Sequence, residues 1–297
     1  TLIYTAWGGL RASIVTDQWQ AFLLIALLII VGTVATDRLP EMSFDHTPQV
    51  PVGSALSVAL TLVIAVTAAN LFHQGYWQRL WSARDTSALQ RGAFFGGIIT
   101  IAVVAVVGAL GIAAAMSGTD LGSPPIPFFA MLAEAPAWLT IPALVLALTL
   151  VASSVDTLQN ALASLAVTEK RSLSLTSARW LTVLLMIPVV LIALQGMSVL
   201  RLFLIADLLC ATAVIPVLLG LWKRMSTFAA VCGGLAGLMG AVLPGWYTGG
   251  TLTAGLYAAS FPGAIPTLAP FLGALVCSAG VSILLASVRG SQGAARS

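Results

Sequence analysis

GAFFGGIITIAVVAVVGALGIAAAM, residues 92–116, decides the fold class, because it runs for 25 positions without a charged residue. A helix needs about 20 predominantly apolar residues to cross the roughly 30 Å of bilayer hydrocarbon. In hydrocarbon the backbone donors of a segment have to be satisfied within it, so a run this long and apolar predicts a helix rather than a barrel strand. We therefore interpret residues 92–116 as a transmembrane helix.

Seven further apolar runs of similar character follow the same rule, at residues 20–35, 55–74, 139–166, 180–195, 200–222, 228–243 and 265–286. Of 297 residues, 59% are hydrophobic and only 8% are charged, whereas an ordinary soluble domain is about one quarter charged. These runs predict an all-α polytopic membrane protein, with residues 1–297 forming one transmembrane domain of eight spans. Residues 1–10 are too short to span and are expected to be the tail of a ninth helix, joined to the first span through a turn.

The basic residues predict the orientation of these spans. If the eight spans alternate, 11 of the 13 Lys and Arg residues fall on one side and only Arg38 and Arg201 on the other. Loops rich in Lys and Arg stay in the cytoplasm, which predicts a cytoplasmic C-terminus. The expected location is the plasma membrane. The loops at residues 37–53 and 117–138 are then external. In the second of them, PPIPFFAML is equally compatible with a short amphipathic helix and with a packing loop.

Several classes of function are disfavoured by what the sequence lacks. The basic residues form no stripe or aromatic-interleaved patch of the kind that binds nucleic acid. The two histidines, His46 and His73, are predicted on opposite sides of the membrane, and no nucleophile or metalloprotease motif accompanies them. Cys210, Cys232 and Cys277 have no pairing or metal-binding spacing. We therefore expect a membrane protein that handles a small solute, with lipid as its other partner, rather than an enzyme. The oligomeric state is left open.

Polar residues inside the predicted spans are the first candidates for function, since each has to be compensated or used. Helical spacing places Ser153, Asp156 and Thr157 on one face, with Ser154 about 100° around the helix. Hydroxyl and carboxylate oxygens are the ligands that sodium, a hard cation, prefers. The alternative is that these hydroxyls bond back to the preceding helical turn or hold two helices together. Asp17, at the start of the first span, is either a helix N-cap or part of an ion path.

The chain resembles the sodium:solute symporter family in four segments: IYTAWGGLRASIVTDQWQ (3–20), NLFHQGYWQRLWSARD (70–85), ASSVDTLQNALASL (152–165) and SVLRLFLIADLLCATAVIPVLLGLWKR (198–224). The FxQxYWQ pattern at residues 72–78 is most similar to the urea and polyamine branch. The resemblance implies the inverted-repeat fold of leucine-type transporters, with residues 55–222 as the second repeat. It also implies that this chain is the C-terminal part of such a protein and lacks the first helices.

The resemblance further implies sodium as the coupling ion and a specific set of ligands. In the family, the paired hydroxyls on the ion-binding helix hold one sodium, and some members hold a second at a site that includes an aspartate of a TDxxQ motif. Carried onto this chain, the sodium ligands are Ser153, Ser154 and the backbone carbonyl of Leu150, with Asp156, Thr157 and Asp17 for a second ion. Because Asp156 stands where several members have serine, the second ion is sodium, a proton or absent.

Three further polar residues are candidate solute contacts. Thr67 and Asn70 lie in the span at residues 55–74, and Asp207 lies about two turns into a later span, where Arg201 is six residues away. The expected function is sodium-coupled symport of a small solute. The alternatives are proton-coupled symport and a transporter-like sensor or receptor domain, because fold does not fix function.

Overall fold

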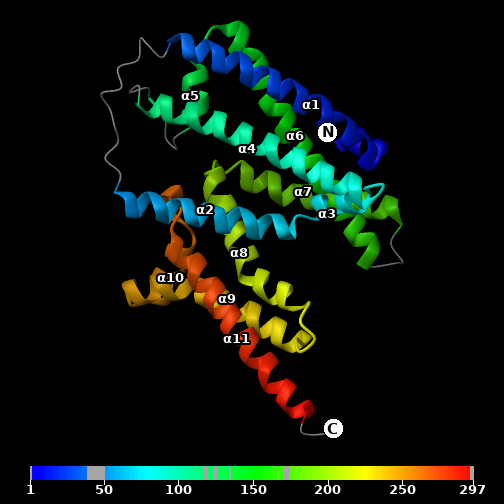
Figure 1. The fold of residues 1–297 in the computed structure, drawn as a ribbon, viewed down its shortest axis with the longest axis vertical. Helices are drawn as coiled ribbons and strands as arrows, with labels where there is room; N and C mark the ends of the chain where they lie inside the picture. The colour runs from blue at the N-terminus through cyan, green and yellow to red at the C-terminus, as the bar shows by residue number, and fades with distance from the viewer. Residues whose placement is uncertain are drawn as a thin grey trace. The chain divides into compact units, whose positions relative to one another are not determined.

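The computed structural model describes residues 2–38, 51–116, 120–122, 126–133, 135–169 and 174–294, and the elements within them are helices (Figure 1). Their bounds are α1 Leu2–Arg38, α2 Val52–Phe72, α3 Gln74–Trp81, α4 Thr86–Met116, α5 Pro127–Ala133, α6 Ala137–Glu169, α7 Leu175–Ala193, α8 Val199–Leu219, α9 Thr227–Gly249, α10 Leu252–Ala259, the 3-10 turn η2 Pro262–Ala264, and α11 Leu268–Ala294. The all-α polytopic class predicted from the sequence is confirmed.

Within the described residues, seven helices are long and apolar enough to cross a bilayer, and each coincides with a predicted span: α1, α2, α4, α6, α8, α9 and α11. The remaining predicted span, residues 180–195, coincides with α7, whose apolar part Val183–Ala193 is shorter than a full span. Large apolar side chains are exposed around these helices, among them Phe94, Ile101 and Leu148. A helix that is apolar on all sides belongs in lipid or in a protein core, so the exposed side chains fit a lipid environment.

The predicted turn near residue 11 is wrong, because α1 is one continuous helix from Leu2 to Arg38. The segment contains no proline to break a helix. Its acid, Asp17, is paired with Arg79 and so needs no place at a helix end. The N-cap interpretation of Asp17 is also wrong, because Asp17 lies in the interior of α1.

The chain divides into two compact units that interleave along the sequence. One contains residues 1–49 and 74–191, and the other residues 50–73 and 192–297. In the first, α1 packs along α6 and α4 (Figure 1). A buried cluster of Val31, Leu110, Leu132, Leu139 and Ala143 joins these helices to α5. The PPIPFFAML segment includes the short helix α5, in agreement with the helical one of its two interpretations, and the amphipathic character of that helix stays a prediction. The inverted repeat stays a prediction.

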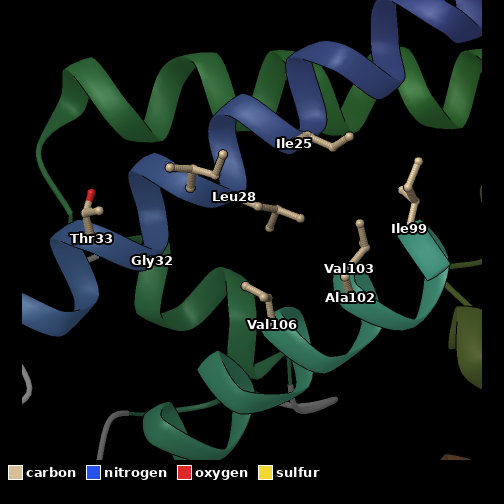
Figure 2. Close-up of a pocket in the computed structure, with 9 residues that line it drawn as sticks. Ile25, Leu28, Gly32, Thr33, Ile99, Ala102, Val103 and Val106 are labelled. Atoms are coloured by element: carbon tan, nitrogen blue, oxygen red, sulfur yellow. The ribbon is translucent and has the colours of Figure 1, made fainter.

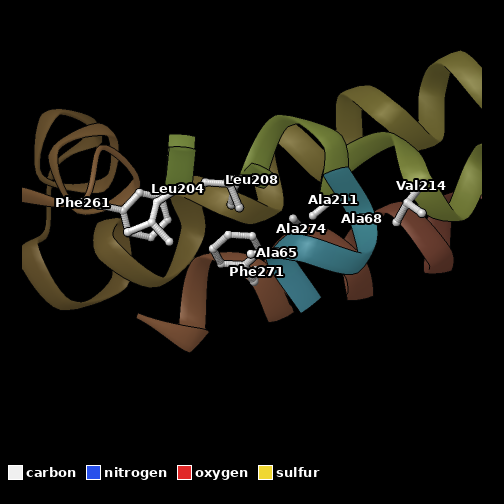
Figure 3. Packing of buried hydrophobic residues seen from close by; sticks show 10 residues of the cluster. Ala65, Ala68, Leu204, Leu208, Ala211, Val214, Phe261, Phe271 and Ala274 are labelled. Carbon is white, nitrogen blue, oxygen red and sulfur yellow. The ribbon is translucent and has the colours of Figure 1, made fainter. Parts of the chain in front are cut away.

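The second unit is built on α8, which packs against α2, α9 and α11. Figure 3 shows the core of this unit, in which Leu204 and Leu208 of α8 lie against Phe271 and small residues such as Ala65 of α2. Phe261 and Phe271 stack at a tilted angle with ring centroids 5.7 Å apart. Because Ala65 is a small residue, the backbones of α2 and α8 can approach closely there.

The backbones of α9 and α11 also approach closely in this unit. A Cβ placed on Gly240 of α9 would lie 2.2 Å from the carbonyl oxygen of Gly273 and 2.7 Å from the Cβ of Cys277. The neighbour Gly234 faces open space, with no atom within 4 Å of its position for a Cβ. Helices in lipid associate through such small-residue contacts, since no hydrophobic driving force remains between them.

Gly240→Ala is therefore expected to destabilise the protein by about 1 to 3 kcal/mol through overpacking against α11. Gly234→Ala, on the same helix, is the matched control and should be neutral or slightly stabilising, because alanine favours the helix. Thermal unfolding of the two purified variants in detergent measures the difference. Equal melting temperatures would contradict the packing of α9 on α11.

Candidate functional site

The polar network of the first unit is centred on Asp17 of α1. Its Oδ1 accepts a short hydrogen bond from the Ser153 hydroxyl of α6, and its Oδ2 lies 2.5 Å from Nη2 of Arg79. The same Arg79 nitrogen donates to Thr157 Oγ1 at 3.1 Å. Three helices thus contribute to one network, since Arg79 comes from α3. The carboxylate and the guanidinium are each about one third exposed, at 32% and 28%.

The short helix α3 is fixed to α6 by a second set of contacts. Gln78 Nε2 donates to the backbone carbonyl of Asn160 at 3.4 Å and also contacts the Ser164 hydroxyl. On the other side of the network, Gln20 Nε2 of α1 donates to the Thr149 carbonyl of α6 at 3.1 Å. The network therefore lies between a helix pair and a short helix that amide side chains hold in place.

The face of α6 predicted from helical spacing is buried. Ser153, Asp156 and Thr157 are 6%, 0% and 8% exposed. Ser154 is exposed, and its hydroxyl donates to the carbonyl oxygen of Leu150 at 3.1 Å. This back-bonding is the packing arrangement that the sequence left open as an alternative. Asp156 Oδ1 accepts from Asn160 Nδ2 at 3.1 Å, one turn along the same helix.

The electrostatics of the network follow from the Asp17–Arg79 pair. The carboxylate, the Ser153 hydroxyl and the Thr157 hydroxyl form a set of hard oxygen atoms suited to a monovalent cation. The guanidinium of Arg79 supplies the positive charge that this oxygen set attracts. A second cation at Asp17 would repel Arg79, so the two positive charges compete for one carboxylate.

Over the part of the chain that the structure describes, no group of three or more His, Cys, Asp or Glu residues could hold a metal ion.

The three candidate solute contacts lie in the second unit. Thr67 and Asn70 of α2 are exposed, whereas Asp207 of α8 is buried, with 7% exposure. Arg201 does not turn toward Asp207, because its guanidinium donates to the backbone carbonyl and the hydroxyl of Ser260. The ion pair between Arg201 and Asp207 that the sequence left possible is therefore not formed.

A pocket of about 460 Å³ between α1 and α4 is lined almost entirely by apolar side chains. Figure 2 shows Ile25 and Leu28 of α1 and Ile99 and Val106 of α4 lining it. Its single hydroxyl, that of Thr33, donates to the carbonyl of Ile30 within the same helix. Such a wall offers nothing to an ion or a polar solute, so this pocket is not a candidate site.

The sequence did not predict that Arg79 and Gln78 belong to this network. Arg79 served only as one of the basic residues that predict the orientation, and Gln78 only as part of the FxQxYWQ pattern. Arg79 is 62 residues from Asp17 in the chain, so no helical spacing connects them. One signal was present: an arginine close after a long apolar run needs a counter-ion, and Asp17 is an acid near the edge of another run.

No family model matches the sequence, and no solved structure matches it. The spermidine transporter DUR31 of Candida albicans is 28% identical in an alignment of 261 residues that covers 82% of this chain and 50% of that protein. The chain is similar to a transporter over most of its own length. It spans about half the length of that curated relative.

Proposed function

We propose that this chain is part of a secondary transporter that carries a small solute of the polyamine class across the plasma membrane. The similarity to a spermidine transporter and the seven apolar spans support transport. The observation that carries the proposal is the polar network of Asp17, Arg79, Ser153 and Thr157 between apolar helices. Such groups are costly in a membrane unless they are used, and they mark ion and solute pathways.

We also propose sodium as the coupling ion, bound by Asp17, Ser153 and Thr157 in competition with Arg79. In this mechanism the guanidinium of Arg79 pairs with the Asp17 carboxylate whenever sodium is not bound. Sodium entry displaces Arg79 from the carboxylate and thereby loosens α3 from α1. The exchange converts ion binding into a movement of a short helix, which is what coupled transport requires. Ser154 and the Leu150 carbonyl bond to each other, and the proposed ligand set does not include them.

Two further acids are the proposed sites for the other cations. Asp156 is assigned to a second coupling ion, and Asp207 to the charged group of the solute. Asp156 lies one position before Thr157 and is fully buried, so it is suited to a second sodium ion or a proton. Asp207 is a buried acid whose neighbouring arginine is engaged elsewhere, which suits the ammonium group of a polyamine. Thr67 and Asn70 complete the candidate solute contacts as hydrogen-bonding groups.

Uptake of radiolabelled spermidine by cells expressing the full-length protein tests the coupling. One sodium ion moving down ~100 mV and a tenfold gradient supplies about 3.7 kcal/mol, enough for a few-hundred-fold accumulation. A cationic solute gains ~2.3 kcal/mol per charge from the same potential without any ion. We expect uptake to collapse when choline replaces sodium at constant potential. Uptake that follows the pH gradient and ignores sodium would move the coupling role to Asp156 or Asp207.

The orientation is tested by thiol labelling in intact cells. In a background without the native cysteines, Asp120→Cys is expected to react with an impermeant thiol reagent added outside, because the 11 to 2 charge asymmetry makes its loop external. Ser87→Cys, in the first turn of α4, is expected to be protected until the cells are permeabilised. Both positions are exposed, so a reversed pattern would invert the orientation.

A further inference from the structure

Arg201, in the first turn of α8, carries a positive charge that no carboxylate balances among the described residues. Its Nε donates to the Ser260 carbonyl oxygen at 2.7 Å and its Nη2 to the Ser260 hydroxyl at 3.0 Å. Both acceptors are neutral. The ion pairs that the structure shows in its described ranges join Asp17 to Arg79 and Asp85 to Arg84. A guanidinium has five N–H donors, so Arg201 keeps donors for an anion.

A groove of about 260 Å³ begins beside this arginine and runs between α8, α9 and α10. Ser260, the partner of Arg201, is one of its lining residues, which places the guanidinium at the end of the groove. The rest of the lining is almost wholly apolar and includes the exposed side chains of Leu209, Leu238 and Leu256. The groove therefore opens on an exposed apolar surface, with a cation at one end.

Aromatic side chains place this end at the level of the lipid headgroups. Trp246 and Tyr247 lie in the last turns of α9, and Tyr257 lies in α10. They are 45%, 93% and 64% exposed. Exposed Trp and Tyr residues collect at the boundary between hydrocarbon and headgroups. Because α9 runs back along α8, its C-terminal end lies near Arg201.

We propose that this groove binds an anionic phospholipid, whose phosphate contacts Arg201 and one of whose acyl chains occupies the groove. Charge complementarity selects the headgroup, since an arginine binds phosphate oxygens through paired N–H donors. The apolar walls select an acyl chain over a free anion. The lipid joins α8, α9 and α10 at one end of the second unit. This site is independent of the proposed ion site, which lies in the first unit.

Native mass spectrometry of the delipidated full chain tests the proposal, with phosphatidylglycerol and phosphatidylcholine as probes. The wild type is expected to bind phosphatidylglycerol at least about fivefold more tightly, a difference of the size that one arginine near a membrane surface provides. Arg201→Gln should abolish this preference, and Arg201→Lys should keep most of it. Arg224→Gln is the matched control, because Arg224 lies beyond the other end of α8 over the Trp222 ring, and it should leave the preference intact.

The apolar part of the site has its own variant. Ala259→Phe fills the groove and is expected to weaken the binding of both lipids severalfold, while the melting temperature shows that the fold is kept. An unchanged preference in Arg201→Gln would overturn the headgroup assignment. Displacement of phosphatidylglycerol by millimolar inorganic phosphate would equally overturn the proposal, since it would identify a free-anion site. If Arg201→Gln does not fold, loss of lipid binding in Ala259→Phe supports the groove, and unchanged binding there overturns it.

Discussion

Asp17→Asn in the full-length protein is expected to raise the half-saturating sodium concentration by roughly 30- to 150-fold. The carboxylate is the charged member of the proposed ligand set, and a contact to a charged group is worth about 2 to 3 kcal/mol. The substitution keeps the shape of the side chain and removes only its charge. Sodium-dependent uptake measured over a range of sodium concentrations gives the shift directly.

The same variant leaves Arg79 without its counter-ion, so a loss of stability has to be separated from a loss of ion binding. Because the pair is about one third exposed, solvent screens it, and we expect a cost of about 1 to 3 kcal/mol. The double variant Asp17→Asn with Arg79→Gln removes both charges and should recover most of the stability. It should not recover sodium activation. If it does, Asp17 has only a structural role.

Arg79→Gln alone has an effect of opposite sign. Removing the resident cation leaves Asp17 available, so the half-saturating sodium concentration is expected to fall, with weaker coupling between ion and solute. Two measurements are made: the dependence of uptake on the sodium concentration, and the ratio of sodium to solute taken up in each transport cycle. A rise in the half-saturating concentration would show that Arg79 supports the ion site and does not compete for it.

The sequence predicted the helices well because their length and apolarity are dictated by the bilayer. Each of the seven long spans coincides with an apolar run, and the buried face of α6 follows from helical geometry alone. The continuity of α1 was not predicted. Arg11 and Asp17 suggested a basic, acid-containing turn between two helices, whereas the structure pairs Asp17 with Arg79 from another helix. Tertiary pairing overrode the local signal.

Only part of the candidate site could be predicted from the sequence, for a similar reason. Ser153, Asp156 and Thr157 share a face through a fixed spacing, so their common burial was predictable. Arg79 and Gln78 reach the network from α3, and nothing in the local pattern specifies which helix α3 packs against. Ser154 shows the reverse case. Helical geometry placed it about 100° away from Ser153, and the structure gives the two hydroxyls different partners, although the resemblance gives them one role.

Ser153→Ala and Ser154→Ala are expected to differ sharply, although both substitutions remove one hydroxyl and barely change volume. Ser153 is buried and donates to Asp17, so its loss should raise the half-saturating sodium concentration by about tenfold, the value of one charge-assisted hydrogen bond. Ser154 is exposed and bonds back to Leu150, so its loss should change sodium activation less than threefold and alter stability by under ~1 kcal/mol.

Expression and thermal stability of each variant are measured beside uptake. Equal, large shifts in both variants would mean that the Ser154 hydroxyl leaves the Leu150 carbonyl and turns to the ion in the loaded state. Unchanged sodium activation in both variants would remove α6 from the ion site and reduce its hydroxyls to helix packing.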